Sequence, residues 1–324
     1  MRCGSVKSNE VSRSQALPHE RVSKMVHINQ SSNGNAQQKF SEAMAMMLTS
    51  KDGINISVCT WMPGFCQRIL ICVQGLGGHG GYYEELAHQL TLGGTVVVAL
   101  DLRGHGHSEG VRGDIDRFDR YVMDVDVAVT WASTMWPDTP IFVLGESMGA
   151  SIAIQYVTSG MYRTHQIPLA GIVFVSPVLS SAIHPTFGEV VHFIRSLLIA
   201  PKRPTIAVTE REELGCRDPA FNTLLLADPL FVRRVSARFL TMLTIWLWQS
   251  KRKARQINLP LLVLLGGKDY ISRRSGTSAF LRRVPAREQR IVTFPQAYHC
   301  LLRDPDTPDV VGVLNVWLTA HQGK

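Results

Sequence analysis

Short runs of almost uninterrupted apolar residues recur along the chain from about residue 41 onward, and stretches with helical spacing separate them. The apolar runs predict strands, and the stretches whose apolar residues recur every three or four positions predict helices. We expect strands at 43–49, 54–61, 68–74, 95–100, 141–144, 171–175, 261–265 and 289–294. We expect helices at 82–90, 121–135, 147–156 and 310–318.

The order of these elements predicts an α/β fold. Strands that are apolar throughout are buried on both faces, which is typical of a parallel sheet covered by helices. The first two strands are separated by Lys-Asp-Gly at 51–53, a hairpin signal that predicts an antiparallel N-terminal edge. Between Pro177 and Pro260 the alternation stops, and helical patterns occur without a clear strand. We therefore predict one domain over 41–324 with a mostly parallel sheet and an inserted helical cap at about 178–256.

The N-terminal stretch differs from the rest of the chain. Residues 1–40 are rich in Ser, Asn, Gln and charge, which predicts a disordered or loosely attached extension of open purpose. We find no apolar core of a secretory signal and no apolar run long enough to span a bilayer. The six cysteines form no C-x-x-C pair, which fits a reducing compartment. We expect a cytoplasmic protein and leave peripheral membrane association open.

The net charge of +8 is unevenly distributed. Residues 180–256 carry twelve Lys and Arg against six Asp and Glu, whereas residues 41–179 carry seven against thirteen. Nucleic-acid binding requires a basic face organised around a recognised binding motif, and we find no such motif. We expect no nucleic-acid partner and interpret the basic segment as a solvated face or as one attracted to anionic lipid.

A serine between glycines is the first candidate for chemistry. Residues 145–149 read Gly-Glu-Ser-Met-Gly and stand between the strand expected at 141–144 and the helix expected at 147–156. This strand–turn–helix context is that of a nucleophile elbow, in which small neighbours allow a strained turn. The helix N-terminus favours the negative charge that develops during acyl transfer. The context favours Ser147 as a nucleophile over an ordinary glycine-rich turn.

A serine nucleophile needs a base, and the chain order in such enzymes is Ser, then an acid, then His. His299 follows the strand expected at 289–294, at the edge of the sheet where ligands bind in open α/β folds. Asp269 ends a Gly-Gly-Lys-Asp turn after the strand at 261–265, and it would orient the imidazole. The remaining histidines after Ser147 are His165, His184, His192 and His321, which lie in less suitable positions.

The oxyanion of the tetrahedral intermediate requires two backbone N–H donors. Met148, the residue after the nucleophile, is expected to supply one. The glycine-rich stretch at 74–81 follows the third expected strand, and Leu76 within it is our candidate for the second. A phosphate-binding loop is the alternative there, but the spacing and the absence of a lysine disfavour it.

A second glycine-rich block, Asp-Leu-Arg-Gly-His-Gly-His-Ser-Glu-Gly at 101–110, contains two histidines. The H-E-x-x-H spacing is absent, and the block is predicted to be a turn and not a helix. We therefore interpret the block as a structural turn beneath the active site and predict no metal.

Together these residues resemble the monoacylglycerol lipase and lysophospholipase group of α/β-hydrolases, which is also grouped with serine aminopeptidase-like hydrolases. The resemblance spans about residues 43–318 and includes the blocks at 74–86, 101–110, 145–149 and 266–269, with His299 matching the catalytic histidine. It implies an α/β-hydrolase fold and a serine esterase acting on monoacylglycerols or lysophospholipid-like esters without a cofactor. Gln74 stands where the family usually has histidine. Because the oxyanion donor is a backbone N–H, we expect this change to alter the bracing of the loop and not to abolish activity.

Two apolar stretches lie in the expected cap. We expect the one at 239–248 to be buried, and the one at 190–199 to expose an apolar face near basic residues, as a contact with lipid would need. An apolar cap above the nucleophile would form an acyl-chain pocket for a small acyl ester. A peptidase or amidase on the same fold is the nearest alternative, and a non-catalytic binding protein is another.

Overall fold

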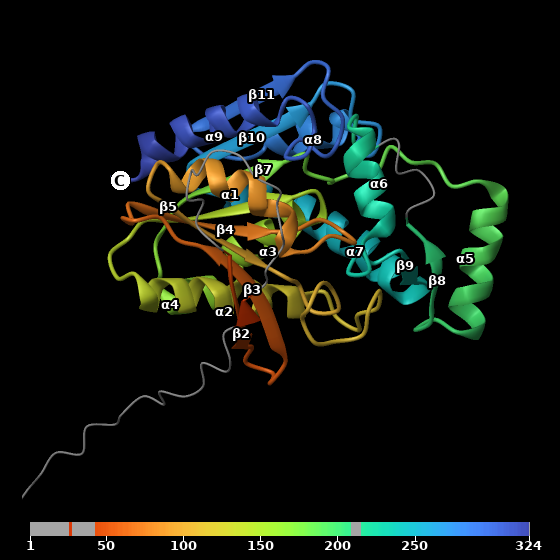
Figure 1. Ribbon diagram of the computed structural model, residues 1–324. Helices are drawn as coiled ribbons and strands as arrows, with labels where there is room; N and C mark the ends of the chain where they lie inside the picture. The colour runs from red at the N-terminus through yellow and green to blue at the C-terminus, as the bar shows by residue number, and fades with distance from the viewer. Residues whose placement is uncertain (1–25, 28–42, 209–214, 324) are drawn as a thin grey trace, which may run out of the picture.

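The computed structural model describes residues 26–27, 43–208 and 215–323 of the chain (Figure 1). Its centre is a nine-stranded sheet with the strand order β1-β2-β3-β5-β4-β6-β7-β10-β11. The strands are β1 (Val26–His27), β2 (Met44–Thr49), β3 (Asn55–Trp61), β4 (Arg68–Val73), β5 (Thr95–Leu100), β6 (Ile141–Glu146), β7 (Leu169–Val175), β10 (Leu261–Gly266) and β11 (Gln289–Phe294).

The sheet has an antiparallel part, which includes the pair β1 and β2, and a parallel part. β2 pairs antiparallel with β3, and β3 pairs antiparallel with β5. From β5 to β11 all neighbouring strands are parallel. Every residue of β4, β5 and β6 is buried, as expected for strands covered on both faces. The predicted parallel sheet with an antiparallel N-terminal edge is confirmed.

Helices cover both faces of the sheet (Figure 1). One apolar core lies under α1 (Glu84–Thr91) and α9 (Thr307–His321). The opposite core lies under α2 (Asp119–Met135) and α3 (Met148–Val157). The sequence pattern did not predict the short helices η1 (Gly80–Tyr83), α4 (Gly160–His165) and α8 (Arg274–Leu281).

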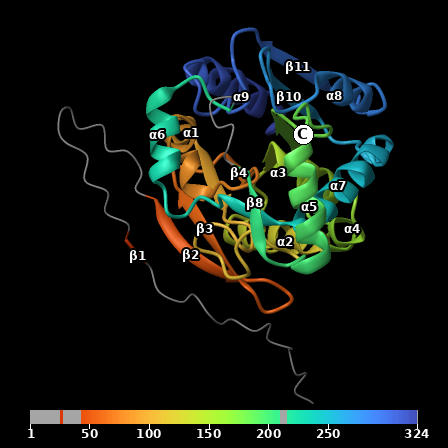
Figure 2. The same cartoon turned by 90° about the vertical axis from the view of Figure 1, so that its right-hand side faces the viewer.

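The chain between β7 and β10, called here the β7–β10 segment, lies on one side of the sheet, and Figure 2 looks onto it. It contains α5 (Phe187–Ile199), β8 (Pro204–Ala207), α6 (Pro219–Ala227), β9 (Arg234–Ser236), α7 (Ala237–Arg252) and η3 (Ala254–Gln256). β8 and β9 pair antiparallel, so the expectation that this segment holds no strand is wrong. Strands of four and three residues are too short to show a periodic pattern.

The two apolar stretches of this segment differ in exposure. The stretch in α5 exposes its apolar face as expected, with Leu198 79% exposed. The stretch in α7 is buried along one side, at Phe239 and Trp246, whereas Ile245 and Trp248 are exposed. The expected burial of α7 therefore holds for only one of its faces.

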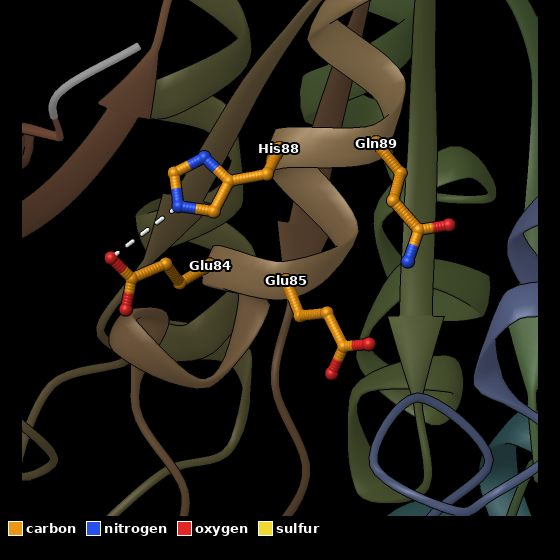
Figure 3. Close-up of a pocket in the computed structure, with 4 residues that line it drawn as sticks. All are labelled: Glu84, Glu85, His88 and Gln89. Carbon is orange, nitrogen blue, oxygen red and sulfur yellow. Dashed lines mark ion pairs between the residues drawn. The ribbon is translucent and has the colours of Figure 1, made fainter. Parts of the chain in front are cut away.

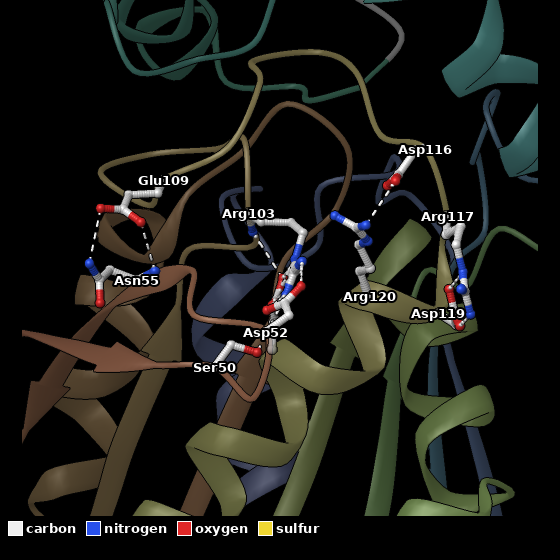
Figure 4. Close-up of polar contacts among 10 residues, drawn as sticks. Ser50, Asp52, Asn55, Arg103, Glu109, Asp116, Arg117, Asp119 and Arg120 are labelled. Atoms are coloured by element: carbon white, nitrogen blue, oxygen red, sulfur yellow. Dashed lines mark hydrogen bonds and ion pairs between the residues drawn. The ribbon is translucent and has the colours of Figure 1, made fainter.

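Polar contacts hold the block at 101–110, among them those of Arg103 and Glu109 drawn in Figure 4. The Arg103 guanidinium lies 2.6 Å from the carboxylates of both Asp52 and Asp124. The Asp101 carboxylate accepts hydrogen bonds from the backbone N–H groups of Gly80, at 2.6 Å, and His107, at 2.8 Å. These contacts support a structural role for the block, because they tie it to α2 and to the end of the loop after β4.

We expect a disordered or loosely attached extension over residues 1–40, and almost all of this range lies outside the described residues. Within that range only Val26–His27 is described, and this strand pairs with Met44 and Ala45 of β2. Among the helices of the described ranges, none has the length and apolarity needed to cross a membrane.

Candidate active site

Ser147 stands at the sharp turn between β6 and α3. Its backbone has φ 55° and ψ −115°, a conformation that L residues rarely adopt. The turn is possible because its neighbours lack side chains. A Cβ at Gly145 would lie 2.6 Å from the backbone N of Ala150, and a Cβ at Gly149 would lie 2.1 Å from the carbonyl oxygen of Val73. The glycines therefore let β4, β6 and α3 approach closely enough to project the hydroxyl beyond the sheet.

Three residues far apart in the sequence form a chain of hydrogen bonds. His299, in the loop after β11, has Nε2 2.8 Å from Oγ of Ser147 and Nδ1 2.8 Å from Oδ2 of Asp269. Because an ionised carboxylate only accepts, Nδ1 carries the proton and Nε2 is free to accept the serine O–H. The structure brings these three sequence-derived candidates together in the arrangement that activates a serine.

The Asp269 carboxylate is itself held in place. Its Oδ1 accepts hydrogen bonds from the backbone N–H groups of Ile271, at 2.8 Å, and Ser272, at 2.9 Å. Oδ2 therefore remains directed at the imidazole. Both the carboxylate and the His299 ring are largely buried, which strengthens their electrostatic interaction.

A cavity of about 890 Å³ opens beside Ser147. Leu76, Met148 and His299 line it together with the serine, so both oxyanion candidates lie in the same cavity as the nucleophile candidate. Much of the remaining wall comes from apolar side chains of the β7–β10 segment, among them Val190, Phe193, Phe221, Leu225, Leu240 and Leu247.

The loop after β4 approaches the serine closely. A Cβ at Gly75 would lie 3.0 Å from the Cβ of Ser147, an unusually tight contact, so glycine lets the backbone come this near without displacing the serine. Gln74 is buried and donates a hydrogen bond of 2.6 Å from Nε2 to the carbonyl oxygen of Gly78. Gln74 therefore braces the curve that presents Leu76 to the cavity.

The other histidines considered from the sequence have different partners. His165 pairs with Lys51 and Asp126, His184 contacts Arg273, and His321 contacts Glu288. His192 of α5 lines the cavity, where its Nε2 lies 3.3 Å from the carbonyl oxygen of Thr205. None of these four contacts Ser147 in the hydrogen bonds of the described residues.

Two cysteines, Cys216 and Cys300, also line the cavity. Burial raises the pKa of the Cys216 thiol to about 11 and raises that of the Cys300 thiol further. Because the thiolate is the reactive form, neither thiol is a second candidate nucleophile near neutral pH.

One ion pair beside the serine was missed at the sequence level. Glu146, directly before Ser147, accepts hydrogen bonds from Arg303 and from the hydroxyl of Tyr83. Burial alone would raise the pKa of the Glu146 carboxyl, but Arg303 and Tyr83 hold it below its usual value. Arg303 has no local sequence signal, since it is 157 residues from its partner.

A second hollow, of about 430 Å³, lies on α1 and shares no lining residue with the cavity at Ser147 (Figure 3). Its lining residues are Glu84, Glu85, His88 and Gln89, and His88 Nε2 lies 3.6 Å from the Glu84 carboxylate. An ion pair spaced four residues apart on one helix is a common surface feature. None of its lining residues is among the nucleophile and oxyanion candidates that line the cavity at Ser147.

The chain is similar in sequence to known hydrolases. Residues 66–306 match the family model described as serine aminopeptidase, S33. The chain is 28% identical to the monoacylglycerol lipase of Mycolicibacterium smegmatis, over 83% of this chain and 94% of that protein. It is 27% identical to the monoglyceride lipase of Rattus norvegicus, over 84% of this chain and 89% of that protein.

The fold is also found among solved structures. A soluble variant of monoglyceride lipase from Saccharomyces cerevisiae, crystallised with a substrate analogue, aligns with a TM-score of 0.76 at 18% identity. The alignment covers 90% of this chain and 99% of that one. The α/β-hydrolase fold expected from the sequence is confirmed.

Proposed function

The chain belongs to the serine aminopeptidase S33 family of hydrolases, and from this premise we propose that it cleaves carboxylic esters of acyl chains through an acyl-enzyme intermediate. The reaction is assigned to Ser147 as nucleophile, His299 as general base and acid, and Asp269 as the group that orients His299. The backbone N–H groups of Leu76 and Met148 are proposed to bind the oxyanion. The reaction requires no cofactor.

The proposed reaction has two steps. Oγ of Ser147 attacks the ester carbonyl while Nε2 of His299 takes its proton, and a tetrahedral oxyanion forms. The C–O bond to the alcohol then breaks, and the imidazolium of His299 donates the proton to the leaving oxygen. Water, deprotonated by His299, attacks the acyl-serine by the same path, and the carboxylic acid leaves as Ser147 recovers its proton.

One observation carries the proposal. The hydrogen-bonded chain Ser147–His299–Asp269, with both links at 2.8 Å, opens onto a cavity walled largely by apolar side chains. The first feature supplies an activated nucleophile, and the second provides apolar surface for an acyl chain.

We propose monoacylglycerols or lysophospholipid-like esters as the substrate class. The relatives named monoacylglycerol lipase and monoglyceride lipase support acylglycerol esters, and a Bacillus subtilis relative named as a phospholipase, 25% identical, keeps the lysophospholipid alternative. The cavity wall is largely apolar, which favours an acyl ester over the peptide substrate of an aminopeptidase, whose charged α-amino group would need a polar partner when buried. Two carboxylates line the cavity, but Glu146 is paired with Arg303, and Glu189 accepts a hydrogen bond from the backbone N–H of Thr186.

The β7–β10 segment is proposed to act as a cap that also contacts lipid. It supplies much of the cavity wall. On α5, Phe187 is 84% exposed and Ile194 is 49% exposed, so apolar side chains face outward beside the cavity. An exposed apolar helix face next to basic residues is typical of a contact with lipid aggregates.

The substrate class is tested with a panel of esters that varies the acyl length and the head group, together with aminoacyl amides. We expect kcat/KM to rise with acyl length for neutral glycerol esters, and amides to be poor substrates. Ser147→Ala is the control for background hydrolysis. Equal rates on acetyl and long-chain esters would contradict the acyl pocket, and preferential cleavage of amides would favour a peptidase.

A further inference from the structure

Arg303 lies four residues beyond His299 and reaches back to the elbow. Its Nη1 donates to Oε1 of Glu146 at 2.5 Å, and its Nη2 donates to Oε2 at 3.1 Å. Both side chains are almost fully buried, at 9% and 7% exposure. This paired geometry fixes both the position and the orientation of the guanidinium. It joins the loop that carries His299 to the residue directly before Ser147.

Aromatic rings enclose the same guanidinium. The central carbon of Arg303 lies 5.2 Å from the ring centre of Tyr82, 5.4 Å from that of Tyr83 and 5.8 Å from that of Phe221. Tyr82 and Tyr83 follow the loop that contains Leu76, and Phe221 belongs to α6. Cation–π attraction within this distance range therefore ties the guanidinium to the oxyanion loop and to the β7–β10 segment.

Among the described hydrogen bonds, the other attachments of the His299 loop lead away from the elbow: the backbone N–H of Lys268 donates to the carbonyl oxygen of Ala297 at 3.0 Å, and Asp304 pairs with Arg217. The imidazole itself bonds to Ser147 and Asp269, and the backbone N–H of Cys300 donates to the carbonyl oxygen of Gly215 at 2.7 Å. The base must be held to within a few tenths of an ångström of the nucleophile for proton transfer to be efficient. Arg303 is placed to supply that restraint from the side of the elbow.

We propose that Arg303 is a positioning residue for the reaction: its buried pair with Glu146 and its packing on Tyr82, Tyr83 and Phe221 hold His299 against Ser147. This inference rests on the proposed ester hydrolysis and deepens it. Arg303 lines the cavity, but its described side-chain hydrogen bonds go to Glu146 and not to Ser147 or Asp269, so it is assigned no contact with the reacting atoms. It acts through the loop that carries His299.

A purely structural ion pair would give a different response to mutation. If the pair serves only to neutralise two buried charges, replacing both by neutral side chains would restore stability and activity together. If Arg303 positions His299, the same double replacement restores stability but leaves kcat low, because the two hydrogen bonds between the Arg303 guanidinium and the Glu146 carboxylate are lost. The two roles therefore separate in a comparison of unfolding free energy with kcat.

The test uses Arg303→Lys, Arg303→Met and the double variant Glu146→Gln with Arg303→Met, assayed on one soluble ester. Arg303→Lys keeps the charge but loses the paired geometry, and we expect kcat to fall about 10- to 100-fold with KM within about twofold. The double variant is expected to regain stability over Arg303→Met without regaining kcat. Arg103→Lys is the matched control, since Arg103 also forms a buried pair, and it is expected to lower stability while leaving kcat unchanged.

Unchanged kcat in Arg303→Lys, or recovery of kcat in the double variant, would overturn the inference. If the double variant fails to fold, the result for Arg303→Lys decides. Failure of the proposed function is distinguishable, because the wild-type protein would then hydrolyse no ester in the same assay.

Discussion

Oδ2 of Asp269 lies 2.8 Å from Nδ1 of His299, while the other carboxylate oxygen accepts two backbone N–H groups. The carboxylate is thus fixed before any substrate binds, and it favours the imidazole tautomer whose Nε2 can accept the Ser147 proton in the proposed reaction. In Asp269→Asn the amide can turn its NH₂ group toward His299 and favour the opposite tautomer.

We expect Asp269→Asn to lower kcat by about 10⁴-fold with little change in fold, as loss of the orienting carboxylate does in serine proteases. Asp306→Asn is the control, because Asp306 pairs with Arg217 on the same side of the molecule and does not contact His299 in the described contacts. Steady-state kinetics on a soluble ester decide the matter. Wild-type kcat in Asp269→Asn would show that His299 is oriented by other groups.

His105 predicts a pH dependence of stability. Burial lowers the pKa of its imidazole to about 4, and Nδ1 lies 3.2 Å from the carbonyl oxygen of Arg103. In the unfolded chain the His105 imidazole is protonated as the pH falls below about 6.5, whereas in the folded protein it stays neutral down to about pH 4. The stabilisation is therefore complete above pH 6.5 and is lost as the pH falls toward 4.

The contribution of His105 falls by about 2 kcal/mol between pH 7 and pH 5, at 1.36 kcal/mol for each pKa unit. Urea unfolding of the wild type and of His105→Gln at these two pH values measures it. The wild type is expected to lose more stability on acidification than the variant, by about this amount. Equal losses in the two proteins would mean that His105 is protonated alike in the folded and unfolded states.

The close packing at the elbow predicts opposite effects for two Gly→Ala changes. In Gly149→Ala the new Cβ would meet the carbonyl oxygen of Val73 at 2.1 Å, and the backbone must shift, at a cost of about 1–3 kcal/mol. In Gly312→Ala, on the exposed side of α9, the Cβ meets nothing within 4 Å, and helix propensity improves by about 0.5–1 kcal/mol. The midpoint temperature of thermal unfolding should fall for Gly149→Ala and rise for Gly312→Ala. Equal shifts of this temperature in the two variants would contradict the packing argument.

The exposed face of α5 predicts an effect confined to aggregated lipid. Ile194→Glu with Leu198→Glu places two charges on that face, and we expect vesicle binding to fall by at least roughly tenfold while hydrolysis of a soluble short-chain ester persists. Val316→Glu is the matched control, since Val316 is 61% exposed on α9, whereas the proposed lipid contact lies on α5. Unchanged vesicle binding in the α5 variant, or an equal loss in the control, would exclude α5 as the contact.

The sequence predicted the central sheet because its strands are buried on both faces and remain apolar along their whole length, as at β4 and β5. Ser147 and Asp269 could be nominated for the same reason, since each closely follows such a strand. His299 follows β11, an edge strand with exposed residues, and could be nominated from its place after the last expected strand. Parallel strands have their carboxyl ends at the same edge of the sheet, so residues that follow different strands in the sequence come close together in space.

The remaining features depend on contacts between distant residues. β8 and β9 have only four and three residues and form through their mutual pairing. The pair between Glu146 and Arg303 has no local pattern, because charged side chains at these positions are equally compatible with exposed turns. Tertiary packing alone buries them beside the nucleophile candidate.

The proposed reaction depends on Ser147 as the nucleophile, and labelling with a fluorophosphonate tests this assignment most directly. The probe phosphonylates an activated serine, and mass spectrometry of the peptides identifies the residue modified. We predict a single adduct on Ser147 in the wild type, concurrent loss of ester hydrolysis, and no adduct in Ser147→Ala. An unlabelled Ser147 in folded protein, or ester hydrolysis that persists after complete labelling, would contradict the account.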